Sequence, residues 1–375
     1  MSRYSSFKGR ANTHLPDNYW LAHELCFAVH DIMVQLLVSG RRACAFSVEF
    51  ELRDEADRAA FEADIFEWLD KFRGIEERVA VLVTTIFPAV LGDMLHCFYE
   101  ALETSRKGKL TISYMLLRKP LQESLFVLET IVADREGFAK NLTYEPIKLS
   151  SQGVGGQIVH SRNIQLVLEA LGETERFDPG YLAQLRYDKS ASDGFDGVCN
   201  KAMHLFTSHK AIQTEPLNIN FIFSGSDAML TQWSYLYSRL PYLLVYMHRI
   251  VEHICVRIAP TDPNYVSDMD RRISALVLLW WDTVKAPYAE PHLERFAAKT
   301  RDWLHQHCVS AGFRAPNRRD LIRMGKNGAY PGESYLSVKR RYRRFGRAAE
   351  MSGAAAPSSV MHFVRRLMSK LGGKP

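Results

Sequence analysis

Residues 115–129 read MLLRKPLQESLFVLE, and this stretch decides the fold class. Its leucines recur three and four residues apart, the spacing that places side chains on one face of an α-helix. The polar side chains Arg118, Gln122 and Glu129 fall on another face. A helix with an apolar stripe must bury that stripe against other elements, and here the pattern favours other helices.

Similar spacing recurs along most of the chain. Asp54 is placed to cap one helix and Gly74 to end it. Val48–Leu52 alternates apolar and polar side chains, and Leu217–Phe223 is also strand-like. Helical spacing covers residues 19–38, 54–72, 76–104, 111–133, 199–210 and most of 226–310. We therefore expect a mainly α, multi-helix bundle with at most a few short strands and a flexible basic C-terminal tail.

The chain divides into five regions by composition and pattern. They are a polar arm (1–18), a helical region (19–140), a loop-rich connection with one helix (141–225), a second helical region (226–313) and a basic tail with a linker and a terminal amphipathic helix (314–375). We expect the two helical regions to share one core, because 375 residues can bury a large one.

Charge is divided unevenly between body and tail. The chain has 48 basic and 42 acidic residues, but from Arg314 onward there are 15 basic and 3 acidic residues. The tail therefore carries +12 and the rest −6. An acidic body with a basic appendage is typical of proteins that contact nucleic acid, an anionic membrane surface or an acidic protein partner.

Several classes of protein are disfavoured. Six cysteines without a CxxC pair indicate reduced thiols, no secretory signal begins the chain, and the longest apolar run, from Val79 to Gly92, is too short to span a membrane. These features predict a cytoplasmic protein without a transmembrane segment. Motifs of the well-marked enzyme classes, such as GxSxG and HExxH, are missing, and we expect neither a cofactor nor a metal.

The tail holds the densest cationic run, KRRYRRFGR at residues 339–347, in which aromatic rings interrupt the charges. Such a run is typical of nucleic-acid contact, although a charge run can also be simply solvated. The predicted nucleic-acid-binding residues are Lys339, Arg340, Arg341, Arg343, Arg344 and Arg347. The amphipathic segment after Ser359 suits a membrane surface, the acidic body or a partner groove.

Three groups in the body are candidates for chemistry, each with a structural alternative. Arg118 beside Gln122 and Glu129 could hold a phosphate, or the three could pair internally. His204 and His209 could transfer protons or contact an anion, or they could be core or capping histidines. Five residues apart on a helix they would point about 140° apart, which disfavours a shared metal.

The third group lies on a helix expected from Ser238 to Ile258, with Pro241 in its first turn. Tyr242, Tyr246 and Arg249 share a stripe there. Rings interleaved with a guanidinium suit single-stranded RNA, and aromatic residues at this spacing also suit a core.

The segment RDWLHQH places Arg301 and His307 on a predicted helix with five residues between them. This arrangement resembles the RNase motif of the HEPN superfamily, whose helical dimers join two such motifs at one cleft and cleave RNA without metal. The resemblance implies that His307 acts as the acid/base and that Arg301 stabilises negative charge on the scissile phosphate.

The stretch LLRKPLQE at residues 116–123, which ends in Glu123, resembles a helix of uncharacterised bacterial proteins, some of them grouped with HEPN-type abortive-infection proteins. Together these likenesses suggest a metal-free, RNA-cleaving or toxin-like defence protein that acts as a homodimer. The alternative is a non-catalytic adaptor that binds nucleic acid or a protein through its basic tail.

Overall fold

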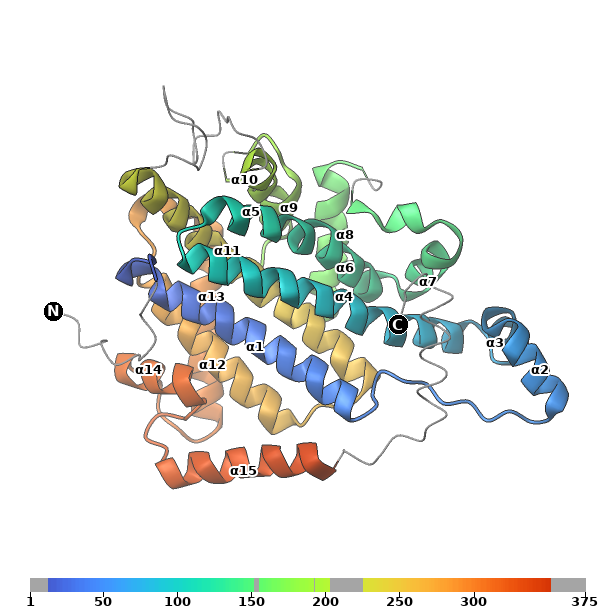
Figure 1. Ribbon diagram of the computed structural model, residues 1–375. Coiled ribbons are helices and arrows are strands. Elements are labelled where there is room, and N and C mark those ends of the chain that lie inside the picture. The colour runs from blue at the N-terminus through green and yellow to red at the C-terminus, as the bar shows by residue number, and fades with distance from the viewer. Residues whose placement is uncertain (1–12, 152–154, 192, 203–224, 352–375) are drawn as a thin grey trace.

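The computed structural model describes residues 13–151, 155–191, 193–202 and 225–351, which form helices and no strand (Figure 1). The mainly α fold is therefore confirmed. The helices are α1 (Trp20–Arg42), α2 (Glu55–Ala63), α3 (Ile65–Phe72), α4 (Ile75–Arg106), α5 (Leu110–Lys119), α6 (Leu125–Ala133), α7 (Arg135–Tyr144), α8 (Gln157–Leu171), α9 (Pro179–Tyr187), α10 (Phe195–Ala202), α11 (Ser226–Ile258), α12 (Pro263–Trp281), α13 (Pro291–Ser310), α14 (Arg318–Asn327) and α15 (Tyr335–Met351).

Helix α11 is the centre of the bundle, with α1 packed against it and against both α4 and α12 (Figure 1). Every residue of α11 from Gln232 to His248 is buried. A helix that is buried all round its axis must be surrounded by other helices, which is why the two helical regions share one core.

Pro241 lies inside α11, so the expected helix start near Ser238 is wrong. Proline has no N–H to donate to the carbonyl four residues earlier, which belongs to Tyr237. The indole Nε1 of Trp280 on α12 donates to that carbonyl at 2.7 Å. A hydrogen bond from a neighbouring helix thus replaces the one that proline removes.

The segment predicted as one helix over 54–72 is two helices. Asp54 caps α2, as expected, by accepting from the amide of Asp57. Asp64 then starts α3 by accepting from the amides of Phe66 and Glu67. A second capping aspartate inside a periodic stretch divides the helix.

The strand expected at Val48–Leu52 is extended chain without a strand partner. Its apolar side chains pack beside Trp68 on α3, and the ring of Phe50 lies 5.3 Å from the indole ring. The alternation therefore reflects burial against a helix. The other expected strand, Leu217–Phe223, lies outside the described residues.

The connection 141–225 holds three helices in its described part, α8, α9 and α10, where the sequence predicted one. Pro179 occupies the first position of α9, and Asp178 caps it by accepting from the amide of Tyr181 at 2.7 Å. A capping residue and a proline occupy only one position each, and helices of this length have too few turns for an apolar period to be recognised.

The basic region does not begin as a free tail at residue 314. Met324 of α14 is fully buried with Leu278, Leu304 and Cys308, which belong to α12 and α13. Residues 314–343 are therefore part of the folded body, and 352–375 lie outside the described residues.

Two helical segments, Asp17–Arg42 and Ile75–Arg106, are long and apolar enough to cross a membrane by length and composition. Within their most apolar windows 50% and 61% of the residues are buried inside the structure. Core helices of a bundle pass the same length and hydropathy test, so the two segments do not establish a membrane protein.

Candidate nucleic-acid interface

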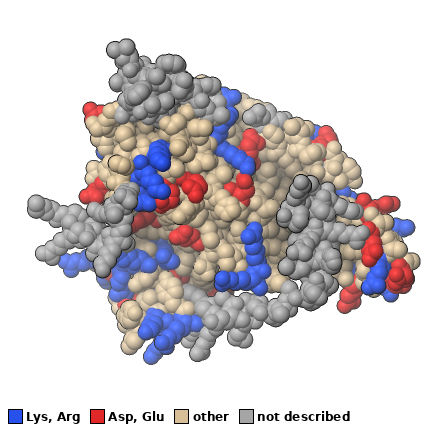
Figure 2. Space-filling view, viewed as in Figure 1, with Lys and Arg blue, Asp and Glu red and all other residues tan. Residues whose placement is uncertain are grey.

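Helix α15 presents a row of cations to solvent. Lys339, Arg340 and Arg343 are exposed, and within the described residues none of the three makes an ion pair. Figure 2 shows Lys and Arg side chains gathered over α14 and α15 on this face. We call Lys339, Arg340 and Arg343 the α15 ridge. The side chains of Arg344 and Arg347, also predicted to bind nucleic acid, lie outside the described part.

Arg341 does not belong to the ridge, and its prediction as a nucleic-acid contact is wrong. Its guanidinium lies 2.9 Å from the Asp268 carboxylate and 2.6 Å from that of Glu333. Both acids are buried, at 0% and 5% side-chain exposure. Arg341 and the buried Val338 therefore hold the other face of α15 against the body.

The buried Asp268 carboxylate is the anchor for this corner of the molecule. Arg271 donates to it from Nη2 at 2.8 Å and to the carbonyl of Gly328 from Nε at 3.0 Å. Gly328 ends α14 with a φ of +60°, and a Cβ there would lie 2.4 Å from the Asp268 carboxylate. Glycine is required by both the left-handed backbone and this close approach.

His307 lies in the same corner, half-buried beside the aromatic rings of Trp303 and Tyr330, whose centroids are 4.9 Å and 5.9 Å from its own. Its Nε2 is 3.3 Å from Arg271 Nη1, 3.3 Å from the Tyr330 hydroxyl and 3.2 Å from Ser267 Oγ. Burial and the Arg271 charge lower the pKa of His307, so the ring is neutral at neutral pH and accepts at Nε2.

Arg301 lies on the same helix as His307 but is exposed. Six residues along an α-helix correspond to about 120° around its axis, so the two side chains point in different directions. The guanidinium that contacts His307 is that of Arg271, a residue that the sequence reading missed. The other predicted catalytic residues, His204 and His209, lie outside the described residues.

Tyr242 and Tyr246 are fully buried, which contradicts their prediction as a stacking surface for bases. The Tyr242 hydroxyl accepts from the amide of Asp178 at 3.1 Å, and the Tyr246 hydroxyl donates to Glu129 at 2.7 Å. The structural alternative, rings of the core, is therefore the correct one.

The polar stripe on α5 and α6 is also paired internally. Arg186 of α9, fully buried, forms an ion pair with Glu129 and donates to the carbonyl of Leu121 at 2.7 Å. Glu123 accepts from the Ser151 hydroxyl at 2.7 Å. Arg118 lies 4.0 Å from the buried carboxylate of Asp196, on α10. Glu129 and Glu123 are therefore paired within the bundle.

A fourth group combines the residue types that ligate metals. Ligand atoms of His248, Glu252 and Asp270 lie within 4.8 Å of one another. Arg249 already binds both carboxylates, at 2.5 Å and 3.0 Å, and also contacts Glu173 at 2.7 Å. A divalent ion here would have to displace that guanidinium, so we assign Arg249 as the counter-ion of the cluster.

The candidate residues thus fall into a buried set that stabilises the bundle and an exposed set on α15, with His307 between them. Arg249 and Glu123, which are half-buried, are also paired within the body, whereas the exposed set on α15 leaves cationic charge unneutralised by described residues. The chain matches no known protein family, no curated protein and no solved structure.

Proposed function

We propose that this protein is a non-catalytic, helical nucleic-acid-binding protein that contacts the phosphates of single-stranded RNA through the α15 ridge. The observation that carries the proposal is the pairing of Arg341 with Asp268 and Glu333, which fixes the orientation of α15. The ridge cations then face solvent on a helix that is paired with the body, without carboxylate partners in the described chain.

The neighbouring surface supports the same assignment. Tyr335, one turn before Lys339 on α15, is 75% exposed and offers a ring on which a base can stack. Each cation that neutralises a phosphate releases condensed counter-ions, so binding should weaken steeply as salt rises. The acidic body would repel RNA elsewhere and direct it to this corner.

The test replaces the three ridge cations with glutamine and measures fluorescence anisotropy with a labelled RNA of about 20 nucleotides. The affinity of the parent should fall steeply between about 50 and 200 mM salt. The salt slope is the slope of the logarithm of the binding constant against the logarithm of the salt concentration, and it should be smaller by about two in the variant. A parent-like affinity and slope in the variant would reject the ridge as the contact surface.

The matched control removes the same charge elsewhere. Lys140, Arg162 and Lys189 are exposed and lie on or beside α7, α8 and α9. Replacing these three with glutamine should leave the salt slope within about half a unit of the parent, because a local contact and not net charge determines it. An equal loss in both variants would indicate nonspecific attraction.

The second candidate function is metal-free RNA cleavage in a homodimer, as the HEPN resemblance implies. The observation that favours it is the neutral His307 imidazole beside the Arg271 guanidinium and the Tyr330 hydroxyl, which together offer a base and a charge stabiliser. RNA should then be cleaved in the presence of EDTA.

His307→Ala should abolish that cleavage, and His305→Ala on the same helix is the control that should not. Cleavage that persists in His307→Ala would exclude this site. An absence of cleavage by the parent, together with RNA binding, would favour the non-catalytic function.

A further inference from the structure

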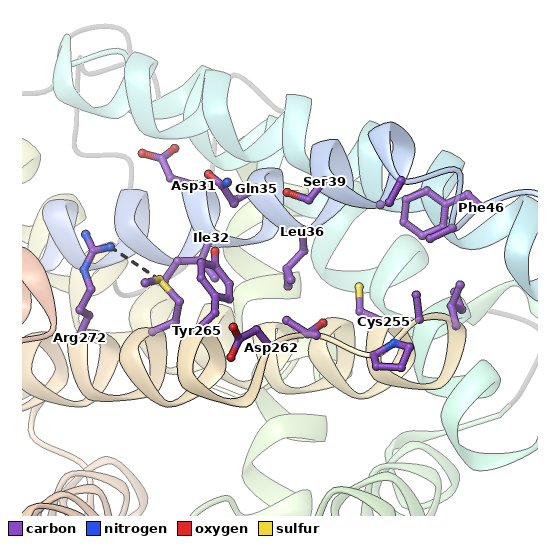
Figure 3. Close-up of a pocket in the computed structure, with 18 of the residues that line it drawn as sticks. Asp31, Ile32, Gln35, Leu36, Ser39, Phe46, Cys255, Asp262, Tyr265 and Arg272 are labelled. Atoms are coloured by element: carbon purple, nitrogen blue, oxygen red, sulfur yellow. Dashed lines mark hydrogen bonds between the residues drawn. The ribbon is translucent and has the colours of Figure 1, made fainter. Parts of the chain in front are cut away.

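A cavity of about 630 Å³ lies between the C-terminal half of α1 and the junction of α11 with α12. It is the right size for a small organic ligand. Figure 3 shows the side chains of α1 on one wall and those of the α11–α12 junction on the other. Tyr342 of α15 also lines it.

The two ends of the cavity differ in chemistry. Phe46 and Cys255 lie toward one end of the view in Figure 3, and Arg272 lies at the opposite end beyond Tyr265. Ile258 and Pro260 add apolar surface to the lining, while Gln35 adds a polar group. A ligand that fills both ends must itself have an apolar part and a polar part.

Arg272 is a basic side chain that lines this cavity, and no described residue forms an ion pair with it. Its Nε is shielded from solvent and has no hydrogen-bond partner in the described chain. Its Nη1 contacts the sulfur of Met269 at 3.6 Å, and Arg272 makes no ion pair with a described residue. A shielded guanidinium nitrogen without an acceptor is costly unless a ligand supplies one.

The carboxylates of Asp31 and Asp262, which also line the cavity, contact groups other than Arg272. Asp31 lies 2.9 Å from the Nδ1 of His30, and Asp262 caps α12 by accepting from an amide at 2.8 Å. Asp268 is close enough for Arg272 to act on its pKa, but its Oδ1 contacts Arg271 and Arg341, and its Oδ2 accepts from the Tyr342 hydroxyl at 3.4 Å. None of these three carboxylates forms an ion pair with Arg272, so its guanidinium can accept an anionic ligand as a partner.

We propose that this cavity binds a small amphiphile with one anionic head group, a carboxylate or a phosphate, whose oxygens accept from Arg272 and whose hydrocarbon part extends toward Phe46. A guanidinium matches both head groups, because each offers two oxygens in one plane. The proposal is independent of RNA binding, since it uses none of the ridge cations.

Isothermal titration of the full chain with decanoate, decyl phosphate and decanol tests the site. The three probes share a tail and differ in head group. At least one anionic probe should bind about tenfold or more tightly than decanol, and the tighter of the two anions identifies the head group. Equal affinity for decanol and both anions, or no binding of any probe, would overturn the proposal.

Two variants locate the ligand. Arg272→Gln should weaken the anionic probes by about tenfold and leave decanol unchanged, whereas Leu36→Trp should fill the apolar part and weaken all three. Arg319→Gln, at an exposed arginine of α14, is the matched control and should change nothing. Parent-like decanoate binding by both test variants, with circular dichroism showing them folded, would exclude this cavity.

Discussion

At the residue scale, a buried ion pair joins Arg186 and Glu129 in the core. Both side chains are nearly inaccessible, and Tyr246 donates a further hydrogen bond to Glu129. Arg186→Met would leave that carboxylate buried without its counter-ion, so we expect the free energy of unfolding to fall by about 3–5 kcal/mol in urea denaturation.

An exposed ion pair provides the comparison. Lys119 and Asp93 lie 2.7 Å apart, with side chains 61% and 47% exposed. Lys119→Met should cost less than about 1 kcal/mol, because solvent screens the pair. Similar losses in the two variants would show that Arg186 does not act through its buried charge.

Glu252 gives the stability a pH dependence. Burial and the neighbouring Asp270 raise its pKa from 4.5 to about 7, so the folded chain retains a proton that the unfolded chain has already released. The free energy of unfolding should therefore fall as pH rises from about 5 to about 7, and the loss is complete above that.

Glu252→Gln removes this titration while keeping an oxygen for Arg249. We expect the variant to be more stable than the parent by roughly 1–3 kcal/mol at about pH 8 and to gain little at about pH 5, measured by urea denaturation at both values. Glu169→Gln, at an exposed site of α8, should show no such difference. A constant offset at both pH values would contradict the assignment.

Individual side chains were harder to predict than the helices that carry them. Tyr242 and Tyr246 do share a helical stripe, and Arg341 does lie in a cationic run, but a stripe identifies a face without saying what covers it. The roles of Arg271 and Arg186 could not be predicted, because His307 and Glu129, which they contact, are distant in sequence. Among the predicted ridge residues, Lys339, Arg340 and Arg343 are exposed as an anion contact requires.

At the element scale, α11 depends on a hydrogen bond from another helix. Trp280→Phe would remove the donor to the Tyr237 carbonyl, which Pro241 has left without an intrahelical partner. We expect a loss of about 1–3 kcal/mol in the free energy of unfolding, part of it from the smaller ring.

Pro241→Ala supplies the missing N–H within α11. In the double variant this amide can bond to the Tyr237 carbonyl, so the cost of Trp280→Phe should shrink by about 1 kcal/mol. The measurement is a double-mutant cycle in urea. Strict additivity of the two substitutions would show that the indole does not replace the missing bond.

Long helices were predictable because their apolar spacing persists over many turns, as in α1 and α4. The division at Asp64 and the short helices α8 and α9 were not, since a cap or a proline outweighs periodicity over two or three turns. The strand prediction for Val48–Leu52 was wrong for a different reason. Alternating apolar residues show that one side of a segment is buried, and a helix can bury that side as well as a sheet can.

At the scale of the whole molecule, one side of the basic region packs against the body and the other side is exposed to solvent. Arg341 and Met324 face the body, while Lys339 and Arg340 face solvent. The uneven charge distribution in the sequence predicted an exposed cationic surface but not the packing of this region against the body. A buried arginine and an exposed one contribute equally to composition. Removing the entire region would therefore remove part of the fold together with the proposed RNA contact.

Two truncations distinguish these roles. Deleting residues 314–375 would uncover Leu278, Leu304 and Cys308 and would take Arg341 away from the buried Asp268. We expect the free energy of unfolding to fall by at least about 3 kcal/mol. Deleting only 352–375 leaves every described contact of α14 and α15 in place, so its cost should be smaller.

The shorter deletion should also retain the RNA affinity and salt slope that depend on the ridge, and both deletions can be compared by urea denaturation and anisotropy. If the 314–375 deletion were as stable as the parent, α14 would contribute no packing energy, and the burial of Met324 would be incidental. If the 352–375 deletion abolished RNA binding in a folded chain, the contact would lie beyond α15, since the ridge cations remain on the helix that Arg341 holds in place.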